Sequence, residues 1–368
     1  MKRLLCILSN MNAGGAETFL MKVYRALDRS KYQMDFCLNV QEKCFYNDEI
    51  LALGGRIFYI PSKSQNASIF KKKLSALVRD REYKYVLRIT SNAAGFMDLM
   101  IAKKAGAKIC SARSSNSSDG GSKIVNMIHR VARAMYVKYV DVKFAPSDLA
   151  AIYTFGERAY KRGEVTVLPN AVDLNVFKYD EVARDQIRLQ FNISESTTVI
   201  GHIGRFMEQK NHSFLVKIFD SIHKTNPDTV LLLVGVGGLE AQIKEQIASY
   251  GLAENVIFAG LRSDVPQVLS AMDVFVMPSF FEGMPNTVIE AQATGLPCLI
   301  SDTITREANI TGLVEYLPLQ NPDVWATKAL SLVSENRLDT KQAFRENKYD
   351  IESTVGTFVN LVFGERYI

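Results

Sequence analysis

The sequence predicts an α/β protein made of two doubly wound domains, each with a mainly parallel sheet. Three observations favour this class. The chain has 368 residues, which suit two domains better than one core. Short apolar segments alternate with amphipathic ones in both halves. A polar stretch without strand signals, Asp173–Ser196, separates the two series. We therefore place one domain at residues 1–177 and the other at 178–349, and we expect a C-terminal helix at about residues 350–368 to pack back on the first domain.

The first half predicts a βαβ series, because apolar runs of strand length are followed by longer segments with one apolar face. The expected strands are Arg3–Leu8, Met34–Val40, Arg56–Ile60, Tyr85–Ile89, Ala107–Ala112 and Val142–Ala145. The expected helices are Glu17–Leu27, Asp48–Leu53 and Phe70–Arg79. Crossover helices between successive strands indicate a parallel sheet with helices on both faces.

The second half repeats this organisation after Thr197. The expected strands are Thr198–Ile203, Thr229–Val234, Val256–Phe258, Val274–Met277 and Cys298–Ile300. The expected helices are His212–Thr225, Leu239–Ser249, Val265–Ala271 and Thr287–Ala293. Each half is therefore expected to be Rossmann-like, with ligands at the carboxyl edge of its sheet.

The composition indicates a soluble globular protein of the cytosol. Hydrophobic residues make up 47% and charged residues 23%. The longest apolar run, Val230–Val236, is too short to span a bilayer, and Ser9 ends the first apolar run too early for a signal peptide. Five cysteines without paired spacing and four histidines without a ligand pattern favour reduced core thiols and no metal site.

The charge is divided unevenly along the chain. Residues 1–180 hold 29 Lys and Arg against 16 Asp and Glu, a net of +13, while residues 181–368 hold 15 against 23, a net of −8. A basic half can face nucleic acid or anionic lipid. A solvated surface without any partner explains the same numbers equally well.

The first candidate site is the segment Asn12–Glu17, which lies between the first expected strand and helix. Its paired glycines, Gly14 and Gly15, let the backbone approach a ligand closely, and the helix start offers free N–H groups to a phosphate. The pattern is not the GxGxxG fingerprint of nicotinamide-binding proteins. A simple tight turn would also use two glycines.

The second candidate site follows the strand Thr198–Ile203, at Gly204, Arg205 and Lys210. Two cations at the carboxyl edge of a sheet can neutralise a diphosphate leaving group without a metal ion. The structural alternative is a surface arginine and a helix-start lysine that share no partner.

The third candidate site is the segment Phe281–Glu290, between a strand and a helix that Pro285 and Asn286 are expected to start. Free N–H groups of the loop can bind an anion, while the carboxylates of Glu282 and Glu290 can accept hydrogen bonds from sugar hydroxyls. A capped helix with two surface glutamates is the alternative.

Together these segments resemble the family-4 glycosyltransferases, bacterial enzymes of the GT-B fold that build polysaccharides and glycolipids. The family signature, two glutamates separated by seven residues, is matched by Glu282 and Glu290. The other matching segments occur in the family's order: Gly14–Glu17, Pro169–Asp173 with Phe177, Gly204–Arg205 with Lys210, Leu233–Gly237 and Ala291–Pro297.

The resemblance implies two Rossmann-like domains facing a central cleft and a retaining, metal-independent hexosyl- or N-acetylhexosaminyl-transferase. Gly15 is expected to bind the donor phosphate through its N–H, Arg205 and Lys210 to clamp the diphosphate, Glu290 to hold the ribose and Glu282 to contact the transferred sugar, with Glu282, Arg205 and Lys210 as the catalytic set. The remaining expected donor-binding residues are Gly14, Gly204, Gly235, Gly283, Met284, Pro285, Asn286 and Thr287. The expected donor is a UDP-sugar, the expected acceptor is a saccharide or a lipid-linked sugar of cell-surface polysaccharide biosynthesis, and no cofactor and no nucleic acid are expected.

One segment departs from the family pattern. Many members carry a histidine near the reacting sugar in a stretch similar to His-Ser-His-Asn, whereas this chain has Arg113-Ser114-Ser115-Asn116. In this alignment Ser115 replaces the histidine, and it cannot accept a proton near neutral pH. We place Arg113, Ser115 and Asn116 on the acceptor and sugar side.

The segment Lys123–Lys138 predicts a basic amphipathic helix. Such a helix can lie on an anionic membrane, at the inner face of which relatives often use lipid-linked acceptors. In the alternative, Ile124, Ile128, Val131 and Met135 pack on the sheet.

Two other functions compete with transfer. One is a nucleotide-sugar or anionic-lipid binding protein without turnover, which the serine at position 115 motivates. The other is a UDP-sugar 2-epimerase of the same fold, although no set of acid and base groups for that reaction is evident.

Overall fold

The computed structural model describes residues 1–12, 14–115, 123–334 and 336–365. The chain divides into two compact units, Met1–Ala171 with Lys348–Ile368 and Val172–Asn347. The divisions fall a few residues before the expected boundaries at 177 and 349. Within the described residues, no helix has both the length and the apolar character needed to cross a membrane.

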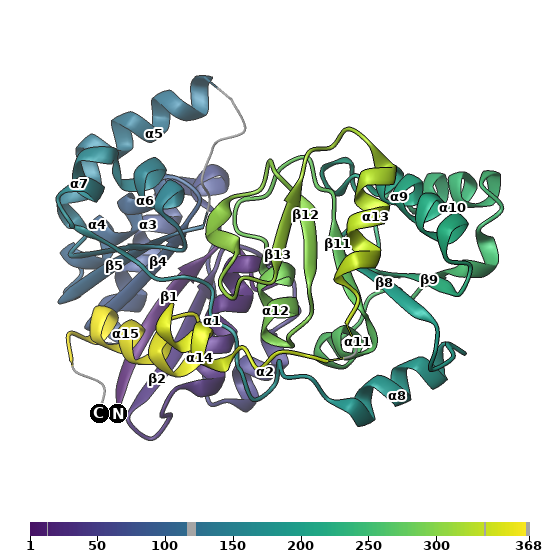
Figure 1. Ribbon diagram of the computed structural model, residues 1–368. Helices are drawn as coiled ribbons and strands as arrows, with labels where there is room; N and C mark the ends of the chain where they lie inside the picture. Colours follow the sequence, from purple (N-terminus) through teal and green to yellow (C-terminus); the bar gives the residue numbers. More distant parts are fainter. Residues whose placement is uncertain (13, 116–122, 335, 366–368) are drawn as a thin grey trace. The chain divides into compact units, whose positions relative to one another are not determined.

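The first unit contains a parallel sheet in the order β3-β2-β1-β4-β5-β6-β7 (Figure 1). The strands are β1 (Lys2–Leu8), β2 (Tyr32–Leu38), β3 (Ile57–Tyr59), β4 (Tyr85–Thr90), β5 (Ile109–Ser114), β6 (Val142–Ala145) and β7 (Val165–Val167). The order reverses between β1 and β4, which pair in register with Leu4 opposite Tyr85. A reversal of this kind defines a doubly wound sheet.

Helices cover both faces of this sheet. They are α1 (Gly15–Ala26), α2 (Asn47–Ala52), α3 (Lys63–Asp80), α4 (Phe96–Lys104), α5 (Lys123–Tyr136), α6 (Asp148–Phe155), α7 (Glu157–Lys161) and α15 (Ile351–Phe363), with short 3₁₀ turns at Ala93–Gly95 and Val137–Tyr139. Helix α15, near the end of the chain, packs beside α1 (Figure 1). The ring centroid of Phe358 on α15 lies 6.2 Å from that of Phe19 and 6.2 Å from that of Phe144. Helices α3, α4 and α6 share the core of the opposite face.

The second unit contains a parallel sheet in the order β10-β9-β8-β11-β12-β13. Its strands are β8 (Thr198–Ile203), β9 (Thr229–Val234), β10 (Val256–Phe258), β11 (Val274–Met277), β12 (Cys298–Ser301) and β13 (Val314–Leu317). The order reverses between β8 and β11, where Val274 pairs with Ile200 and Phe275 with Gly201. These strands are adjacent in the sheet although β9 and β10 separate them in the sequence.

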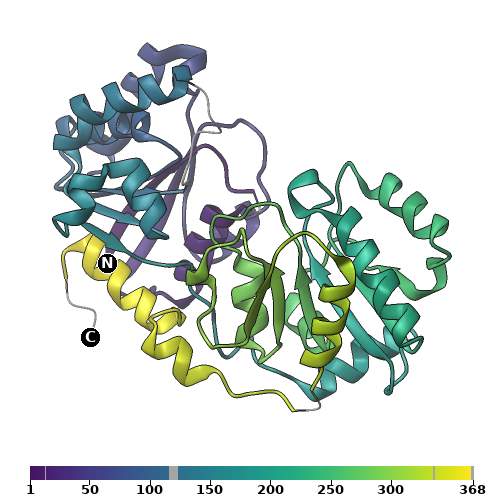
Figure 2. The same ribbon diagram turned by 45° about the horizontal axis from the view of Figure 1, so that its top comes forward.

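The helices of the second unit are α8 (Glu181–Gln190), α9 (His212–Thr225), α10 (Glu240–Ser249), α11 (Val265–Ala271), α12 (Asn286–Ala293), α13 (Pro322–Leu332) and α14 (Lys341–Glu346), with 3₁₀ turns at Glu208–Lys210, Ala253–Asn255 and Arg306–Ala308. Helices α9, α10 and α13 form one core with the sheet, around the fully buried Trp325. Figure 2 shows helices on both sides of this sheet.

Helix α8 lies within the stretch Asp173–Ser196, which the sequence analysis treats as a connection. It is polar on average, but its buried residues, Ala183, Ile187 and Arg188, lie on one face that packs on α11. Polar contacts hold it there: Arg184 and Arg188 each donate to the carboxylate of Asp273 at 2.7 Å. Such contacts depend on residues more than 80 positions away, so local periodicity could not predict them.

Candidate functional site

Two of the expected site segments meet at the reversal of strand order in the second unit. Gly204, Arg205 and Lys210 follow β8, and Glu282 follows β11, the strand that pairs with β8. Parallel strands bring their carboxyl ends to one edge, and the point of reversal leaves a crevice where doubly wound sheets bind ligands. The pairing of β8 with β11 therefore gathers these residues.

Glycines allow the two loops beside this crevice to approach each other. Gly235, after β9, has a φ of +137°, and a Cβ added there would lie 2.1 Å from the carbonyl oxygen of Gly204. A Cβ on Gly237 would lie 2.5 Å from the carbonyl oxygen of Phe206. The N–H of Gly204 donates to the carbonyl of Val234 at 2.9 Å, which fixes the loop after β8. Gly235 is one of the expected donor-binding residues, whereas Gly237 appears only within the matching segment Leu233–Gly237.

Lys210 and Glu282 form an ion pair, with Nζ 2.8 Å from Oε1. Their side chains are 16% and 10% exposed. Two hydrogen bonds join the same two loops: the N–H of Phe280 donates to the carbonyl of Gln209 at 2.9 Å, and Nε2 of the Gln209 side chain donates to the carbonyl of Phe281 at 2.8 Å. Gln209 is thus a supporting residue that the sequence analysis missed, since its role depends on the loop opposite.

Arg205 differs from Lys210 in its surroundings. It is exposed and forms no side-chain hydrogen bond or ion pair with any part of the chain that the structure describes. The aliphatic part of Lys210 instead lies over Gly204, where an added Cβ would be 3.2 Å from Cδ of Lys210. Lys210 is therefore held by the carboxylate of Glu282, whereas Arg205 is available at the surface of the same loop.

The loop Gly283–Pro285 leads into α12, which begins at Asn286, one residue before the expected span Thr287–Ala293. No side chain caps this helix, so its first-turn N–H groups lie uncapped at the positive end of the helix dipole. Glu290, half-buried, lies one turn after Asn286 on α12, and both residues have interaction partners. Met284 and Thr287 are also half-buried, while Gly283 is exposed.

Beneath the loop after β8 lies a pair of buried histidines. His202 donates one hydrogen bond, from Nδ1 to the carbonyl oxygen of Val276 at 2.8 Å, and its ring centroid lies 4.8 Å from that of His212. His212 also stacks on Phe206 at 4.3 Å. Burial, assisted by the charge of Lys210, lowers the pKa of His212 to about 4, and burial lowers the pKa of His202 well below its ordinary value. Both rings are therefore neutral near pH 7.

In the first unit, Gly14 and Gly15 lie at the start of α1, after β1. Gly14 is the N-cap, and its carbonyl accepts from the N–H of Thr18 at 2.9 Å. The carboxylate of Glu17 lies over Gly14, because an added Cβ would be 2.4 Å from Oε2. Burial raises the pKa of Glu17. Gly15 is exposed, so its backbone is accessible to a ligand.

The side chain of Arg113, on β5, lies in the interior of the first unit, and the residue is 1% exposed. Its guanidinium lies 3.8 Å from the ring centroid of Phe19 and donates to Oδ1 of Asn170 at 2.7 Å. Burial lowers its pKa to about 9. Ser115 is half-buried and its N–H donates to the carbonyl of Thr90 at 2.9 Å. Asn116 lies outside the described residues.

The apolar side of α5 faces outward. Met127, Ile128, Val131 and Met135 are 63%, 50%, 53% and 54% exposed. The alternative in which this side packs on the sheet is therefore wrong for Ile128, Val131 and Met135. The side chain of Ile124 lies outside the description. The buried side of α5 is instead held by His129, which accepts at Nδ1 from the N–H of Ala93 at 2.9 Å and donates from Nε2 to the carbonyl of Tyr153 at 2.8 Å.

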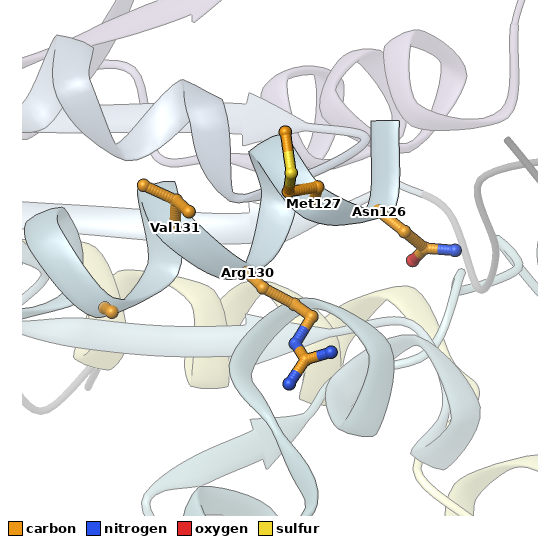
Figure 3. Close-up of a pocket in the computed structure, with 5 residues that line it drawn as sticks. Asn126, Met127, Arg130 and Val131 are labelled. Atoms are coloured by element: carbon orange, nitrogen blue, oxygen red, sulfur yellow. The ribbon is translucent and has the colours of Figure 1, made fainter. Parts of the chain in front are cut away.

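A pocket of about 590 Å³ opens along this outer side of α5. Figure 3 shows Met127 and Val131 with Arg130, whose guanidinium extends away from the helix axis. Asn126 and Ala134 complete the described lining. The side therefore combines apolar surface with a cation.

The arrangement in the second unit suits a ligand that carries a diphosphate and hydroxyl groups. Cations, helix N–H groups and carboxylates lie at one sheet edge, which is the chemistry that binds phosphate and sugar together. Within the described residues, no group of three or more His, Cys, Asp and Glu side chains is placed to hold a metal ion.

Comparisons with known proteins agree with this chemistry. The family described as "Glycosyl transferases group 1" matches residues 197–335. "Putative glycosyltransferase EpsF" of Bacillus subtilis is 35% identical over 369 residues, which cover 98% of this chain and 96% of the relative. An Escherichia coli protein named "UDP-Gal:alpha-D-GlcNAc-diphosphoundecaprenol alpha-1,3-galactosyltransferase" is 35% identical over 142 residues, 38% of this chain and 37% of that one.

Among solved structures, Anabaena HepE in complex with UDP and glucose superposes with a TM-score of 0.76 at 17% identity, covering 99% of this chain and 100% of HepE. This likeness confirms the expected fold class of two Rossmann-like domains of the GT-B type. The match to the Bacillus subtilis relative extends over nearly the whole of both chains. The protein therefore belongs to the group 1 glycosyltransferases and is a glycosyltransferase of the GT-B fold.

Proposed function

We propose that this glycosyltransferase moves a hexosyl or N-acetylhexosaminyl group from a UDP-sugar to a saccharide or lipid-linked acceptor, with retention of configuration and without a divalent metal. The observation that carries the proposal is the Lys210–Glu282 ion pair at the β8–β11 reversal, beside the unpaired Arg205. This places positive charge for a diphosphate next to an acceptor group for a sugar.

The reaction breaks the bond between the anomeric carbon and a diphosphate oxygen and forms a bond from that carbon to an acceptor hydroxyl oxygen, whose proton passes to the departing diphosphate. Negative charge therefore develops on the departing phosphate oxygen. Arg205 and Lys210 stabilise this charge, together with the first-turn N–H groups of α12. Fixed cations of this kind supply what a metal ion supplies in other transferases. As Lys210 turns to the phosphate, Glu282 becomes free to accept a hydrogen bond from the transferred sugar.

The donor and acceptor are proposed from chemistry and kinship together. Glu290, half-buried on α12, is proposed to hold the ribose, and Gly15 to contact the phosphate from the first unit. The complex of HepE with UDP and the name of the Escherichia coli relative, which includes a UDP-sugar and a diphosphoundecaprenol-linked acceptor, support a UDP-sugar and a lipid-linked acceptor. We further propose a role in cell-surface polysaccharide biosynthesis.

The test is a panel of UDP-, GDP- and ADP-sugars, in which release of the nucleoside diphosphate is measured with EDTA present. Turnover with a UDP-sugar and a product of unchanged anomeric configuration by NMR support the proposal. Loss of turnover in EDTA contradicts metal independence, and an inverted product contradicts retention.

Two variants separate transfer from the competing functions. Glu282→Gln is expected to abolish transfer while UDP still binds, and Glu208→Gln, an exposed neighbour, is expected to keep full activity. No turnover with any donor and acceptor identifies a binding protein. Inversion at C2 of the free UDP-sugar identifies an epimerase.

The outer side of α5 suits an anionic membrane surface at the inner face of the cell membrane, because exposed Met127 and Val131 accompany Arg130. Val131→Asp is expected to reduce cosedimentation with liposomes that contain anionic lipid at low salt. Leu149→Asp changes an equally exposed apolar residue on α6 and is the control. Equal sedimentation of all three proteins contradicts membrane binding through α5.

A further inference from the structure

An exposed aromatic ring lies at the carboxyl edge of the sheet in the first unit. Phe45 belongs to the loop that follows β2, and it is 65% exposed. Strands β1 and β2 are parallel neighbours, so this loop lies at the same edge as the segment after β1. Doubly wound sheets bind ligands at this edge. The segment after β1 also contains Gly15, which the proposed reaction assigns to the donor phosphate.

Two hydrogen bonds hold the loop after β2 against the segment after β1. The N–H of Tyr46 donates to the carbonyl of Met11 at 3.1 Å. The N–H of Phe45 donates to Oδ1 of Asn12, also at 3.1 Å. The backbone of Phe45 is therefore fixed beside the glycine segment.

Tyr46 sets the orientation of the Phe45 ring. The two ring centroids are 4.9 Å apart with an interplanar angle of 84°, which is an edge-to-face contact. Tyr46 itself is buried, and its hydroxyl lies 3.0 Å from Oγ1 of Thr18 on α1. This contact covers at most one face of the Phe45 ring, and the exposed remainder is open to a ligand.

Two asparagine amides beside the ring have unused donors. Oδ1 of Asn12 accepts from the N–H of Phe45, and Oδ1 of Asn10 accepts from the N–H of Asn12 at 3.0 Å. These bonds fix the oxygen of each amide toward the backbone, so each Nδ2 faces away from it. Among the described residues, neither Nδ2 has a hydrogen-bond partner. Asn12 is exposed and Asn10 is half-buried, so both can donate to a ligand.

The charges around the ring favour neither an anion nor an anionic membrane. Nζ of Lys43 lies 2.8 Å from Oδ2 of Asp48, and Glu42 is exposed. The loop 39–46, all of which is described, therefore offers no cation without a carboxylate partner, whereas anionic lipid binds unpaired basic residues. Phe45 is also the one exposed apolar residue of this loop. A single ring falls far below the about 800 Å² per partner that a stable protein interface buries.

A sugar has the chemistry that these groups match. A pyranose ring presents an apolar face of C–H groups and a rim of hydroxyls that donate and accept hydrogen bonds. An aromatic ring can pack on the apolar face, and neutral amide donors can bind the hydroxyls. Few polar groups placed around an apolar surface are typical of sites for small ligands.

We propose that Phe45, Asn12 and Asn10 bind the acceptor saccharide, with the ring of Phe45 packed on a sugar and the two amides donating to its hydroxyls. The inference rests on the proposed transfer reaction, and it names residues that select the acceptor. Asn12 lies three residues before Gly15, so the acceptor is held beside the glycine proposed for the donor phosphate. The terminal sugar of a free saccharide and that of a lipid-linked one share this chemistry.

The test is binding of methyl α-glycosides of glucose, galactose and N-acetylglucosamine, measured by saturation-transfer difference NMR with UDP present. Phe45→Leu keeps an apolar side chain but removes the ring, and it is expected to weaken the best glycoside about threefold to tenfold. Phe45→Tyr keeps the ring and is expected to bind like the parent. Asn12→Asp keeps the acceptor for the N–H of Phe45, removes the Nδ2 donor and is expected to weaken binding. The control is Leu51→Ala, at a 57% exposed apolar residue of α2.

Transfer kinetics provide a readout that a purely structural role would not change. With the best glycoside as acceptor, Phe45→Leu is expected to raise the KM of the acceptor about threefold to tenfold and to leave the KM of the UDP-sugar unchanged. Hydrolysis of the UDP-sugar without an acceptor is expected to be equal in the parent and in Phe45→Leu. An octyl glycoside distinguishes the source of the sugar: tighter binding than the methyl glycoside identifies a lipid-linked acceptor, and equal binding identifies a free saccharide.

The failures of this inference and of the proposed function are distinguishable. A parent that hydrolyses a UDP-sugar but binds no glycoside overturns the saccharide site and leaves transfer standing. Equal glycoside affinity in the parent, Phe45→Leu and Asn12→Asp overturns it too, as does a Phe45→Leu protein that loses only liposome binding or dimerisation. A parent that binds the glycoside through Phe45 but hydrolyses no UDP-sugar contradicts the proposed function and supports the saccharide site.

Discussion

The Lys210–Glu282 pair makes a prediction in which stability and activity respond differently to the same two substitutions. The side chains are 16% and 10% exposed, so the pair lies between an exposed ion pair and a fully buried one. Exposed pairs contribute at most about 1 kcal/mol, whereas breaking a buried pair costs about 3–5 kcal/mol. We therefore expect Lys210→Met and Glu282→Gln each to lower the free energy of unfolding by about 2 kcal/mol.

The double variant is expected to recover part of this loss, because neither charge is then left without its partner. Urea unfolding of the four proteins gives the coupling energy, which we expect to be about 1–2 kcal/mol. Transfer is expected to behave otherwise. Lys210→Met removes a cation from the departing phosphate and lowers kcat/KM by about a hundredfold to a thousandfold, the range observed when one oxyanion donor is lost.

The decisive protein is the double variant, assayed for nucleoside diphosphate release with the best UDP-sugar. If Lys210 and Glu282 act on the donor, the double variant recovers part of its unfolding free energy but transfers no faster than either single variant. Activity that returns together with stability would mean that the pair only holds the loops. Activity within about threefold of the parent in Lys210→Met would refute the diphosphate role, since such a change is below about 1 kcal/mol.

Three further predictions concern His212, Gly235 and Phe358. The pKa of His212 is about 4 in the folded protein and about 6.5 in the unfolded chain, so the unfolded chain binds more protons between these pH values and the free energy of unfolding falls as pH decreases. His212→Phe is expected to remove about 2 kcal/mol of the decrease in unfolding free energy between pH 7 and pH 5. Urea unfolding at both pH values measures this decrease. Gly235→Ala places a Cβ 2.1 Å from the carbonyl oxygen of Gly204 at a φ of +137°, so it is expected to weaken UDP binding and to lower the melting temperature. Phe358→Ala opens a cavity next to Phe19 and is expected to cost about 3–5 kcal/mol of unfolding free energy.

Each of these has a matched control. His223→Phe changes a half-buried histidine on the same helix. Gly238→Ala changes a nearby glycine at which an added Cβ meets nothing within 4 Å. Leu361→Ala truncates a partly buried residue of the same C-terminal helix. A pH dependence of stability that is unchanged in His212→Phe would contradict the first prediction. Normal UDP binding by Gly235→Ala would contradict the second, and a loss of unfolding free energy below about 1 kcal/mol in Phe358→Ala would contradict the third.

Much of the fold was predictable from local pattern. The expected spans of β9, α9 and α11 agree with the structure residue for residue, because strong apolar runs and periods are bounded there by polar or helix-starting residues. Other elements were not anticipated, among them β7, β13 and α13. These are short or weakly periodic, and tertiary contacts such as the burial of Trp325 stabilise them.

The candidate site likewise has features that local sequence predicts and others that depend on tertiary packing. Glycine pairs, cations and the spacing of Glu282 and Glu290 are local features, so the sequence by itself determined which residues to consider and, through its resemblance to a family, which chemistry to expect. Only the tertiary structure decided how they meet. Lys210 and Glu282 are 72 residues apart and pair because β8 lies beside β11. The same non-local packing buries Arg113 against Phe19 and leaves Val131 exposed, since burial depends on neighbours that no local pattern specifies.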